Sequence, residues 1–327
     1  MAQRQYDAAH AMDSRMDASP RRAAYASIVL TIALWSSAAV IARGVLGTVA
    51  PVTLAFLRWC VVVACLLPFV WRERRAMLRA ARADARGFAA FALVGFAPQS
   101  CLTYAGLAGS SATTLGLFNS AIPVAIVAAL VLFRGRRLHG IEAVGLVLST
   151  IGVLAILSRG DLRALLALGF SPYVLLLLAG SSVWAVYTLE LANRPTTLSL
   201  AGFVFVAAAF GVAFVAPFAA AEIAWRGWPV IDSPTLAGIL YLGTLPTLVA
   251  ALLYGFGVAR VGAVHAGILT HLMPVFTALL AAAFLGERLY PYHGAGFLLV
   301  AGGAVLCCLR PSPVLTSRAP VRAAADR

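Results

Sequence analysis

The chain has 327 residues, of which 62% are apolar and only 11% are charged, and its mean hydropathy is +0.92. A soluble globular domain carries about 25% charged residues. This composition excludes a soluble enzyme, a nucleic-acid-binding protein and a secreted disulfide-linked scaffold. The apolar residues form separated blocks of roughly 18 to 23, and about 20 are needed to cross the hydrocarbon of a bilayer. The sequence therefore predicts an all-α polytopic membrane protein.

The net charge of +13 comes entirely from arginine, because the chain contains no lysine. The arginines lie in short polar segments between the apolar blocks rather than on one face, so they do not predict a nucleic-acid partner. The five cysteines all lie inside apolar blocks and lack the spacing of a metal site. We expect no metal and no cofactor.

Ten membrane spans are predicted, and lipid-facing backbone requires that they be helices. A β-barrel would instead show short segments that alternate with a period of two. The predicted spans are 24–43, 51–70, 87–107, 112–132, 140–158, 172–192, 198–219, 235–257, 263–284 and 292–309. The polar segments at the two ends of the chain are expected to lack stable structure.

The orientation follows from the distribution of arginine. With the N-terminus in the cytoplasm, 19 arginines fall on the cytoplasmic side and five on the other side, and Arg58 lies inside a span. Positively charged loops stay on the cytoplasmic side of a membrane. Both termini are therefore predicted to be cytoplasmic.

The chain contains an internal repeat. The segment that starts at Gly106 aligns with the segment that starts at Gly257 at a constant offset of 151, which pairs Pro123 with Pro274. The same offset pairs several glycines, namely Gly116 with Gly267, Gly135 with Gly286, Gly145 with Gly296 and Gly152 with Gly303. Trp35 and Trp184 match at an offset of 149, which extends the repeat to five spans in each half.

Five is an odd number, so the second half enters the membrane from the opposite side. Inverted repeats of this kind are typical of transporters, whose substrate site lies near the midplane between the halves. The predicted organisation is an N-terminal tail at 1–23, a first five-helix repeat at 24–158, a periplasmic linker at 159–171, a second repeat at 172–309 and a C-terminal tail at 310–327.

Several of these features together resemble a known family. They are the tryptophan in the first span of each repeat, Arg58 within LAFLRW, and LGERL followed by Gly-Xaa-Gly. They resemble the bacterial drug/metabolite transporter superfamily of the EamA type, over about residues 24 to 309. Within it the chain is similar to the aromatic amino-acid exporters, which implies export of aromatic amino acids and similar small metabolites. The first repeat reads RGRRL where the second reads GERL, so Glu287 has no counterpart and receives no coupling role.

Polar and aromatic side chains near the middle of a span must face protein or water, so they are candidates for substrate contact. The candidates are Trp35, Gln99, Asn119, Trp184, Tyr187 and His271. The two tryptophans either wall a cavity for an aromatic or cationic substrate or are large packing residues at the interface between the repeats.

Three prolines are expected to loosen the helical turn before them, because proline lacks a backbone donor. They are Pro98, Pro123 and Pro274. Carbonyls freed in such turns can hold an ammonium group, while Asn119 or His271 holds a carboxylate. Alternatively, the prolines only bend the helices and the polar groups bond to a neighbouring helix.

Arg58 either attracts a substrate carboxylate or bonds to backbone carbonyls, and its lack of a counterpart in the second repeat favours the structural role. No Asp or Glu lies at the middle of a predicted span. We therefore expect facilitated diffusion, or weak coupling through His271, rather than strong proton antiport. The chain has no P-loop, so ATP is not expected to drive transport.

The sequence thus predicts a monomeric exporter of small metabolites, with aromatic and other apolar amino acids first, that works by alternating access. Its partners are a small-molecule substrate and the lipid bilayer. A nucleobase or drug exporter of the same superfamily is the alternative, and a membrane protein that transports nothing is a third. An intramembrane enzyme is disfavoured, because neither a nucleophile–base pair nor a metal motif such as HExxH occurs.

Overall fold

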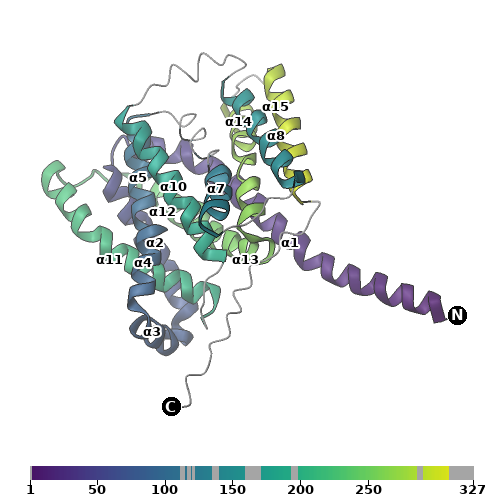
Figure 1. Cartoon of the computed structure of the whole chain (residues 1–327). Coiled ribbons are helices and arrows are strands. Elements are labelled where there is room, and N and C mark those ends of the chain that lie inside the picture. Colours follow the sequence, from purple (N-terminus) through teal and green to yellow (C-terminus); the bar gives the residue numbers. More distant parts are fainter. Residues whose placement is uncertain are drawn as a thin grey trace.

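The computed structural model describes the backbone of residues 2–110, 115, 119, 122–134, 140–158, 171–192, 198–285 and 290–308, and most side chains from residue 21 onward. Within this part of the chain the regular structure is entirely helical (Figure 1). In chain order the helices are α1 (Ala2–Val45), α2 (Pro51–Val70), the 3-10 turn η1 (Trp71–Glu73), α3 (Arg74–Ala83), α4 (Ala85–Val94), α5 (Ala97–Ala108), α7 (Ile122–Arg134), α8 (Gly140–Leu157), α10 (Pro172–Ala192), α11 (Leu200–Arg226), α12 (Ser233–Gly243), the π-helical segment η2 (Thr244–Val249), α13 (Ala250–Leu269), α14 (Leu272–Leu285) and α15 (Pro291–Cys308).

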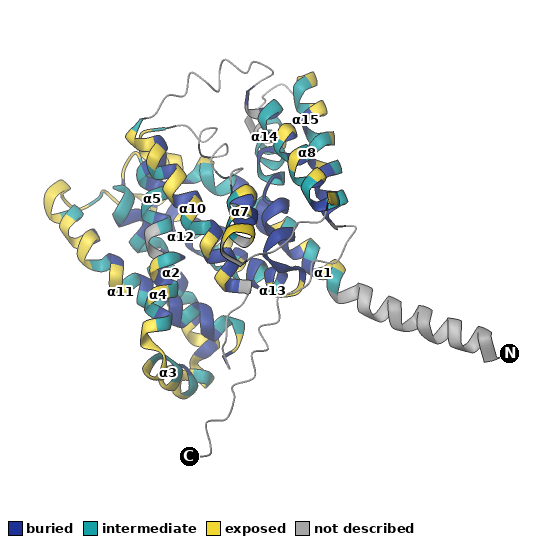
Figure 2. Cartoon of the chain, viewed as in Figure 1, coloured by how far each residue is buried: buried dark blue, intermediate teal, exposed yellow. Residues whose placement is uncertain are grey.

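Among the residues described, six helical stretches are long and apolar enough to cross a membrane. They run over 21–45, 51–83, 85–108, 172–191, 200–226 and 233–269, and two shorter apolar helices cover 140–156 and 291–307. Exposed residues lie along the outer helices of the bundle (Figure 2). Many of them are large and apolar, including Phe69, Trp225 and Leu298, each about four-fifths exposed. A water-soluble surface does not carry so much apolar area, so the fold is that of a multi-pass membrane protein. The number ten and the side on which the termini lie stay predictions.

Several predicted spans match helices closely, and others differ in informative ways. α2 and α10 begin and end at the predicted residues. The predicted span 87–107 is broken between α4 and α5, and the span 235–257 contains the π-helical segment. The polar segment 71–86, between two predicted spans, is mostly helical. Most of 112–121, the linker 159–170, the LGERL motif with Glu287 and the C-terminal tail lie outside the described residues.

The expectation for the N-terminal tail is wrong. α1 begins at Ala2 rather than near residue 24, and it extends away from the rest of the bundle (Figure 1). The segment is rich in alanine, arginine and methionine, which favour helix. Adding turns to a helix that already exists costs far less than nucleating a new one, so the membrane helix continues into the tail.

The main contacts between helices are symmetric with respect to the two repeats. If each helix is replaced by its equivalent in the other repeat, the same set of contacting pairs results. The most extensive contacts join α1 with α13, α10 with α5, α2 with α11, and α8 with α15. α1 and α10 are equivalent because each is the first helix of its repeat. α5 and α13 are equivalent because each follows the break in the third span of its repeat. Exchanging the repeats therefore converts the pair α1 and α13 into the pair α10 and α5. The other two pairs each consist of equivalent helices. An approximate two-fold axis between the halves produces this pattern.

The contact between α8 and α15 shows the two-fold relation at the level of atoms. A Cβ added to Gly145 would lie 2.4 Å from Cys307 Sγ, and a Cβ added to Gly296 would lie 2.4 Å from Ile156 Cγ1. Both the two glycines and the two clashing residues are 151 positions apart in the sequence. The Cβ on Gly296 would also lie 2.8 Å from the carbonyl oxygen of Gly152. Glycine is needed here because the two backbones approach each other directly.

Two glutamates join α2 and α11 at both ends. Glu222, near the end of α11, accepts hydrogen bonds from Thr53 N at 2.7 Å and Thr53 Oγ1 at 2.8 Å, at the start of α2. Glu73, just beyond α2, accepts one from the Oγ of Ser199 at 2.9 Å, the N-cap of α11. The two glutamates are 149 positions apart, the same offset as the tryptophans. A carboxylate is favourable at a helix N-terminus, so Glu222 caps α2 directly and Glu73 binds the serine that caps α11.

The glycine contact can be tested with Gly296→Ala. The new methyl group would overlap a backbone oxygen that cannot move aside, so we expect a loss of about 1–3 kcal/mol in stability. Gly294→Ala, on the same helix with no atom within 4 Å, is the matched control and should be neutral or slightly stabilising. The melting temperatures of the detergent-solubilised variants measure this. Equal melting temperatures would contradict the close contact.

Candidate functional site

A cavity with a volume of about 140 Å³ lies between the two repeats. It is comparable to the engineered cavity of about 150 Å³ in another protein that binds benzene. The residues that line it come from both halves of the chain. They are Trp35, Ala38, Ala39, Ala42, Arg58, Trp59, Phe96, Gln99, Thr103, Tyr104, Leu107, Leu115, Asn119, Ile122, Trp184, Tyr187, Pro246, Thr247, Ala251, Thr270 and Met273.

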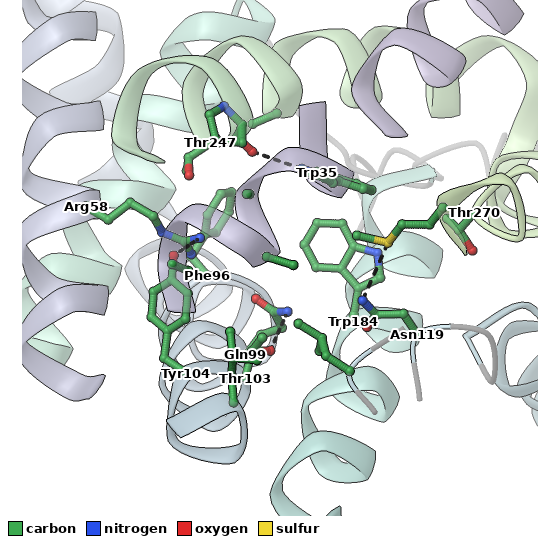
Figure 3. A pocket seen from close by; sticks show the side chains of 18 of the residues that line it. Trp35, Arg58, Phe96, Gln99, Thr103, Tyr104, Asn119, Trp184, Thr247 and Thr270 are labelled. Atoms are coloured by element: carbon green, nitrogen blue, oxygen red, sulfur yellow. Dashed lines mark hydrogen bonds between the residues drawn. The ribbon is translucent and has the colours of Figure 1, made fainter. Parts of the chain in front are cut away.

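The two repeat-related tryptophans meet at this cavity. The rings of Trp35 and Trp184 pack edge to face, with centroids 5.1 Å apart and an interplanar angle of 87° (Figure 3). The indole N–H of Trp35 donates to the carbonyl oxygen of Pro246 at 2.9 Å. Two equivalent residues that touch each other lie close to the axis that relates the halves. The tryptophans therefore pack at the repeat interface and also wall the cavity, and their contact with a substrate stays a prediction.

The cavity extends to one side of the tryptophan pair. Along α1 it passes Ala38 and Ala42, toward the C-terminal end of that helix. The offset of 149 places Tyr187 and Leu191 at the equivalent positions of α10, and both are buried. The ring of Tyr187 packs against that of Trp184, with centroids 4.7 Å apart. Small side chains leave space on one side, and large ones fill the equivalent space on the other.

The predicted amides Gln99 and Asn119 both line the cavity. Gln99 Nε2 donates to Thr103 Oγ1 at 3.0 Å, one turn along α5. Asn119 Oδ1 accepts from Ser181 Oγ at 3.4 Å, and Asn119 Nδ2 lies 3.6 Å from Met273 Sδ (Figure 3). The contact with Ser181 is long for a hydrogen bond and a thioether sulfur is a weak acceptor, so the amide of Asn119 can turn to a ligand at little cost.

His271 is not among the residues that line the cavity. Its ring is fully buried, and Nδ1 lies 2.7 Å from the Oγ of Ser149 on α8. The residue before it, Thr270, does line the cavity. The turn at this point therefore directs adjacent side chains to opposite sides, and the predicted contact between His271 and a substrate is not one that this geometry favours.

The predicted prolines lie in the first turns of helices, and described breaks precede two of them. α5 begins at Ala97, directly before Pro98, after a break in the helix at residues 95–96. Pro274 follows the break at 270–271 that separates α13 from α14. Pro123 is the second residue of α7, and the two residues before Ile122 lie outside the described part.

The sequence did not lead us to predict a further interruption of a helix, at Pro246 within the π-helical segment. The signal was available, because Gly-Xaa-Xaa-Pro occurs both at Gly95–Pro98 and at Gly243–Pro246, which are 148 positions apart. Both halves therefore interrupt the helix of their third span at the same place. Pro246 supplies the carbonyl that accepts from Trp35, so this interruption also positions the wall of the cavity.

Arg58 also lines the cavity, although the predicted set of contact residues leaves it out. Its guanidinium donates to the hydroxyl of Tyr104 at 2.9 Å and to the Oγ of Ser100. It lies over the Tyr104 ring, 4.9 Å from the centroid. The lack of a counterpart in the second repeat favoured a structural role, but the cavity is itself unsymmetrical, so this absence carries no weight.

The cavity has an unusual charge balance. Among the described lining residues, Arg58 is charged and no Asp or Glu occurs. The described residues also contain no group of three or more His, Cys, Asp and Glu that could hold a metal ion. The remaining lining is apolar, aromatic or neutral and polar, which suits a small organic ligand with a flat body.

A model of the EamA-like transporter family matches the chain twice, over residues 22–158 and 171–309. The chain belongs to the EamA-like transporter family. The two matches give the family's repeat in each half, and the family identifies the protein as a transporter rather than an enzyme.

Similar proteins agree with this assignment. An uncharacterized transporter of Archaeoglobus fulgidus is 25% identical over 285 residues, which is 85% of this chain and 95% of that protein. An uncharacterized transporter of Bacillus subtilis, YetK, is 22% identical over 294 residues, which is 88% of this chain and 87% of that protein. One protein with a solved crystal structure has a TM-score of 0.70 at 20% identity, covering 89% of this chain and 97% of the other. This last likeness shows the fold alone.

Cysteine labelling tests whether the cavity is open to water. In a background without the five native cysteines, Ala38→Cys should react with a water-soluble maleimide, because this position lines the cavity. Ile32→Cys, on the same helix at a fully buried position, should not react. Labelling is measured by the mass of the purified protein. Equal reaction of the two positions would overturn the assignment of the cavity.

Proposed function

We propose that this EamA-family chain exports small metabolites across a bacterial inner membrane, with aromatic and other apolar amino acids as its first candidates. The observation that carries the proposal is the central cavity between the repeats, walled by Trp35 and Trp184. Its volume suits one aromatic ring, and flat indole faces bind flat apolar groups well. Gln99 and Asn119 supply both donors and acceptors for the polar end of the substrate.

The proposed mechanism is alternating access by two inverted five-helix repeats with both termini in the cytoplasm. The exchange of helix pairs between the halves supports it, because two similar halves of opposite sense have inward-open and outward-open states of similar energy. The arginines of the segment 72–86 gather on and beside α3, as a cytoplasmic surface requires.

In this orientation the cavity leads outward along α1, past Ala38 and Ala42. Large rings close the cytoplasmic side, where the buried Tyr187 packs against the buried Phe96 and the partly buried Phe91, with both centroids 5.3 Å away. Export then requires these rings to separate while the alanine side closes. His271 holds α14 against α8 through Ser149 and supports the site from outside the cavity.

Uptake of labelled phenylalanine, tryptophan, methionine and threonine into proteoliposomes tests the function. Trp184→Ala removes one wall of the cavity, so saturable uptake should fall at least tenfold. Trp225→Ala is the matched control, because this tryptophan is 81% exposed at the end of α11 and should leave uptake unchanged. A folded wild-type protein that takes up none of the four amino acids would contradict the amino-acid proposal and favour a nucleobase or drug substrate.

The same vesicles test the driving force. Neither a carboxylate nor a histidine occurs among the described lining residues, and His271 faces α8, so the side chains that usually carry protons in coupled transport are absent from this part of the cavity wall. Initial uptake should therefore change less than twofold when a gradient of one pH unit is imposed in either direction. Accumulation of substrate against its own gradient, driven by pH alone, would contradict facilitated diffusion.

A further inference from the structure

The guanidinium of Arg58 is held in place by neutral partners. It donates to the hydroxyls of Tyr104 and Ser100, and both of these residues are almost fully buried. Ser100 Oγ also accepts from Trp59 Nε1 at 3.0 Å and donates to the carbonyl oxygen of Phe96 at 2.8 Å. All the hydrogen-bonding capacity of this hydroxyl is used, so the network fixes where the guanidinium lies.

None of these partners carries a negative charge. Among the described residues the guanidinium bonds to hydroxyls and lies over the rings of Trp59 and Tyr104, and its Nε is buried without a hydrogen-bond partner. Glu222, a carboxylate of the helix packed on α2, bonds to the backbone at the start of α2 instead. A cation within a membrane protein is costly unless an anion or water compensates it. Three of the five N–H donors of the guanidinium, including the buried Nε–H, are unused here.

The rest of the cavity can hold a ligand that pairs with this cation. Arg58, Tyr104, Thr103 and Gln99 gather on one side, and Trp184 faces the same space from the other (Figure 3). A ligand that fits has one anionic group and an apolar or aromatic body. A carboxylate matches the planar fork of arginine.

We propose that Arg58 binds the carboxylate of the substrate, and that the cavity selects apolar or aromatic monocarboxylates without requiring an ammonium group. This rests on the proposed function, in which the cavity is the substrate site. No lining carboxylate among the described residues can pair with the ammonium group of an amino acid. The zwitterion therefore gains from Arg58 what the plain acid gains, and it must additionally strip water from its ammonium group.

Four small ligands that share a phenyl ring on a two-carbon chain separate the charges. They are 3-phenylpropionate, with a carboxylate; phenylalanine, with both charges; phenethylamine, with an ammonium; and 3-phenylpropanamide, with neither. Binding to the wild-type protein in detergent, measured by the quenching of tryptophan fluorescence, should be at least as tight for 3-phenylpropionate as for phenylalanine. Phenethylamine should bind at least tenfold more weakly than either.

Variants assign this selectivity to Arg58. Arg58→Gln should weaken the binding of 3-phenylpropionate by about tenfold to a hundredfold, the range of a hydrogen bond to a charged group. It should leave 3-phenylpropanamide unchanged, which also shows that the cavity is intact. Arg58→Lys should restore part of the affinity, and Arg226→Gln, at an exposed arginine beyond the cavity, should behave as wild type.

The outcomes separate the inference from the function on which it rests. If phenylalanine binds and 3-phenylpropionate does not, or if Arg58→Gln leaves the affinity for both unchanged, the inference fails while the transport site stands. If none of the four ligands binds the folded wild-type protein, the proposed substrate class fails. The ligand comparison on the wild-type protein decides the charge selectivity even if Arg58→Gln does not fold.

Discussion

Apolar helices in a bilayer gain little from the hydrophobic effect when they meet, because lipid is as apolar as their side chains. Close backbone packing and hydrogen bonds between helices have to hold this bundle together. Gly145 and Gly296 provide the first by letting α8 and α15 touch at their backbones. Glu73 and Glu222 provide the second, because Glu73 accepts from Ser199 at the start of α11 and Glu222 accepts from Thr53 at the start of α2. Each device occurs twice, at positions related by the repeat, so the two halves assemble symmetrically.

Beyond the tryptophan pair, equivalent positions of the two repeats no longer carry side chains of similar size. The cavity exists because of this difference. Repeat-related helices bring Trp35 and Trp184 into contact, and beyond them α1 offers alanines where α10 offers Tyr187 and Leu191. A symmetric pair of halves with identical side chains would be equally filled on both sides. The difference in side-chain volume thus leaves open space along α1 and fills the equivalent space along α10, although the two halves have equivalent helices.

The charged side chains that join helices lie in two different places. The carboxylates Glu73 and Glu222 lie at the ends of helices, where they compensate helix N-termini, whereas Arg58 lies beside the cavity with neutral partners. Breaks in the helices at 95–96 and at Pro246 bring further polar groups to the same depth, including the carbonyl that Trp35 uses. The cavity is therefore a positively charged, mainly apolar site, and its charge is one that a small anion can balance.

The apolar blocks and the repeat were sufficient to predict the class of protein, the bounds of α2 and α10 and five of the six candidate residues at the cavity. These features depend on the hydropathy and spacing of neighbouring residues, which the chain displays directly. The helix of the N-terminal tail escaped prediction, because polar composition alone does not show that an adjacent helix can continue.

Which way a side chain points was decided only by tertiary structure. Thr270 and His271 are adjacent, and the break in the helix sends the first to the cavity and the second to Ser149. Arg58 looked structural because the second repeat has no equivalent, and its place beside the cavity depends on Ser100 and Tyr104 from another helix. The sequence by itself determined the membrane fold and its two halves, because both follow from the hydropathy and spacing of residues along the chain. The contents of the cavity depend on contacts between distant helices, which no local pattern contains.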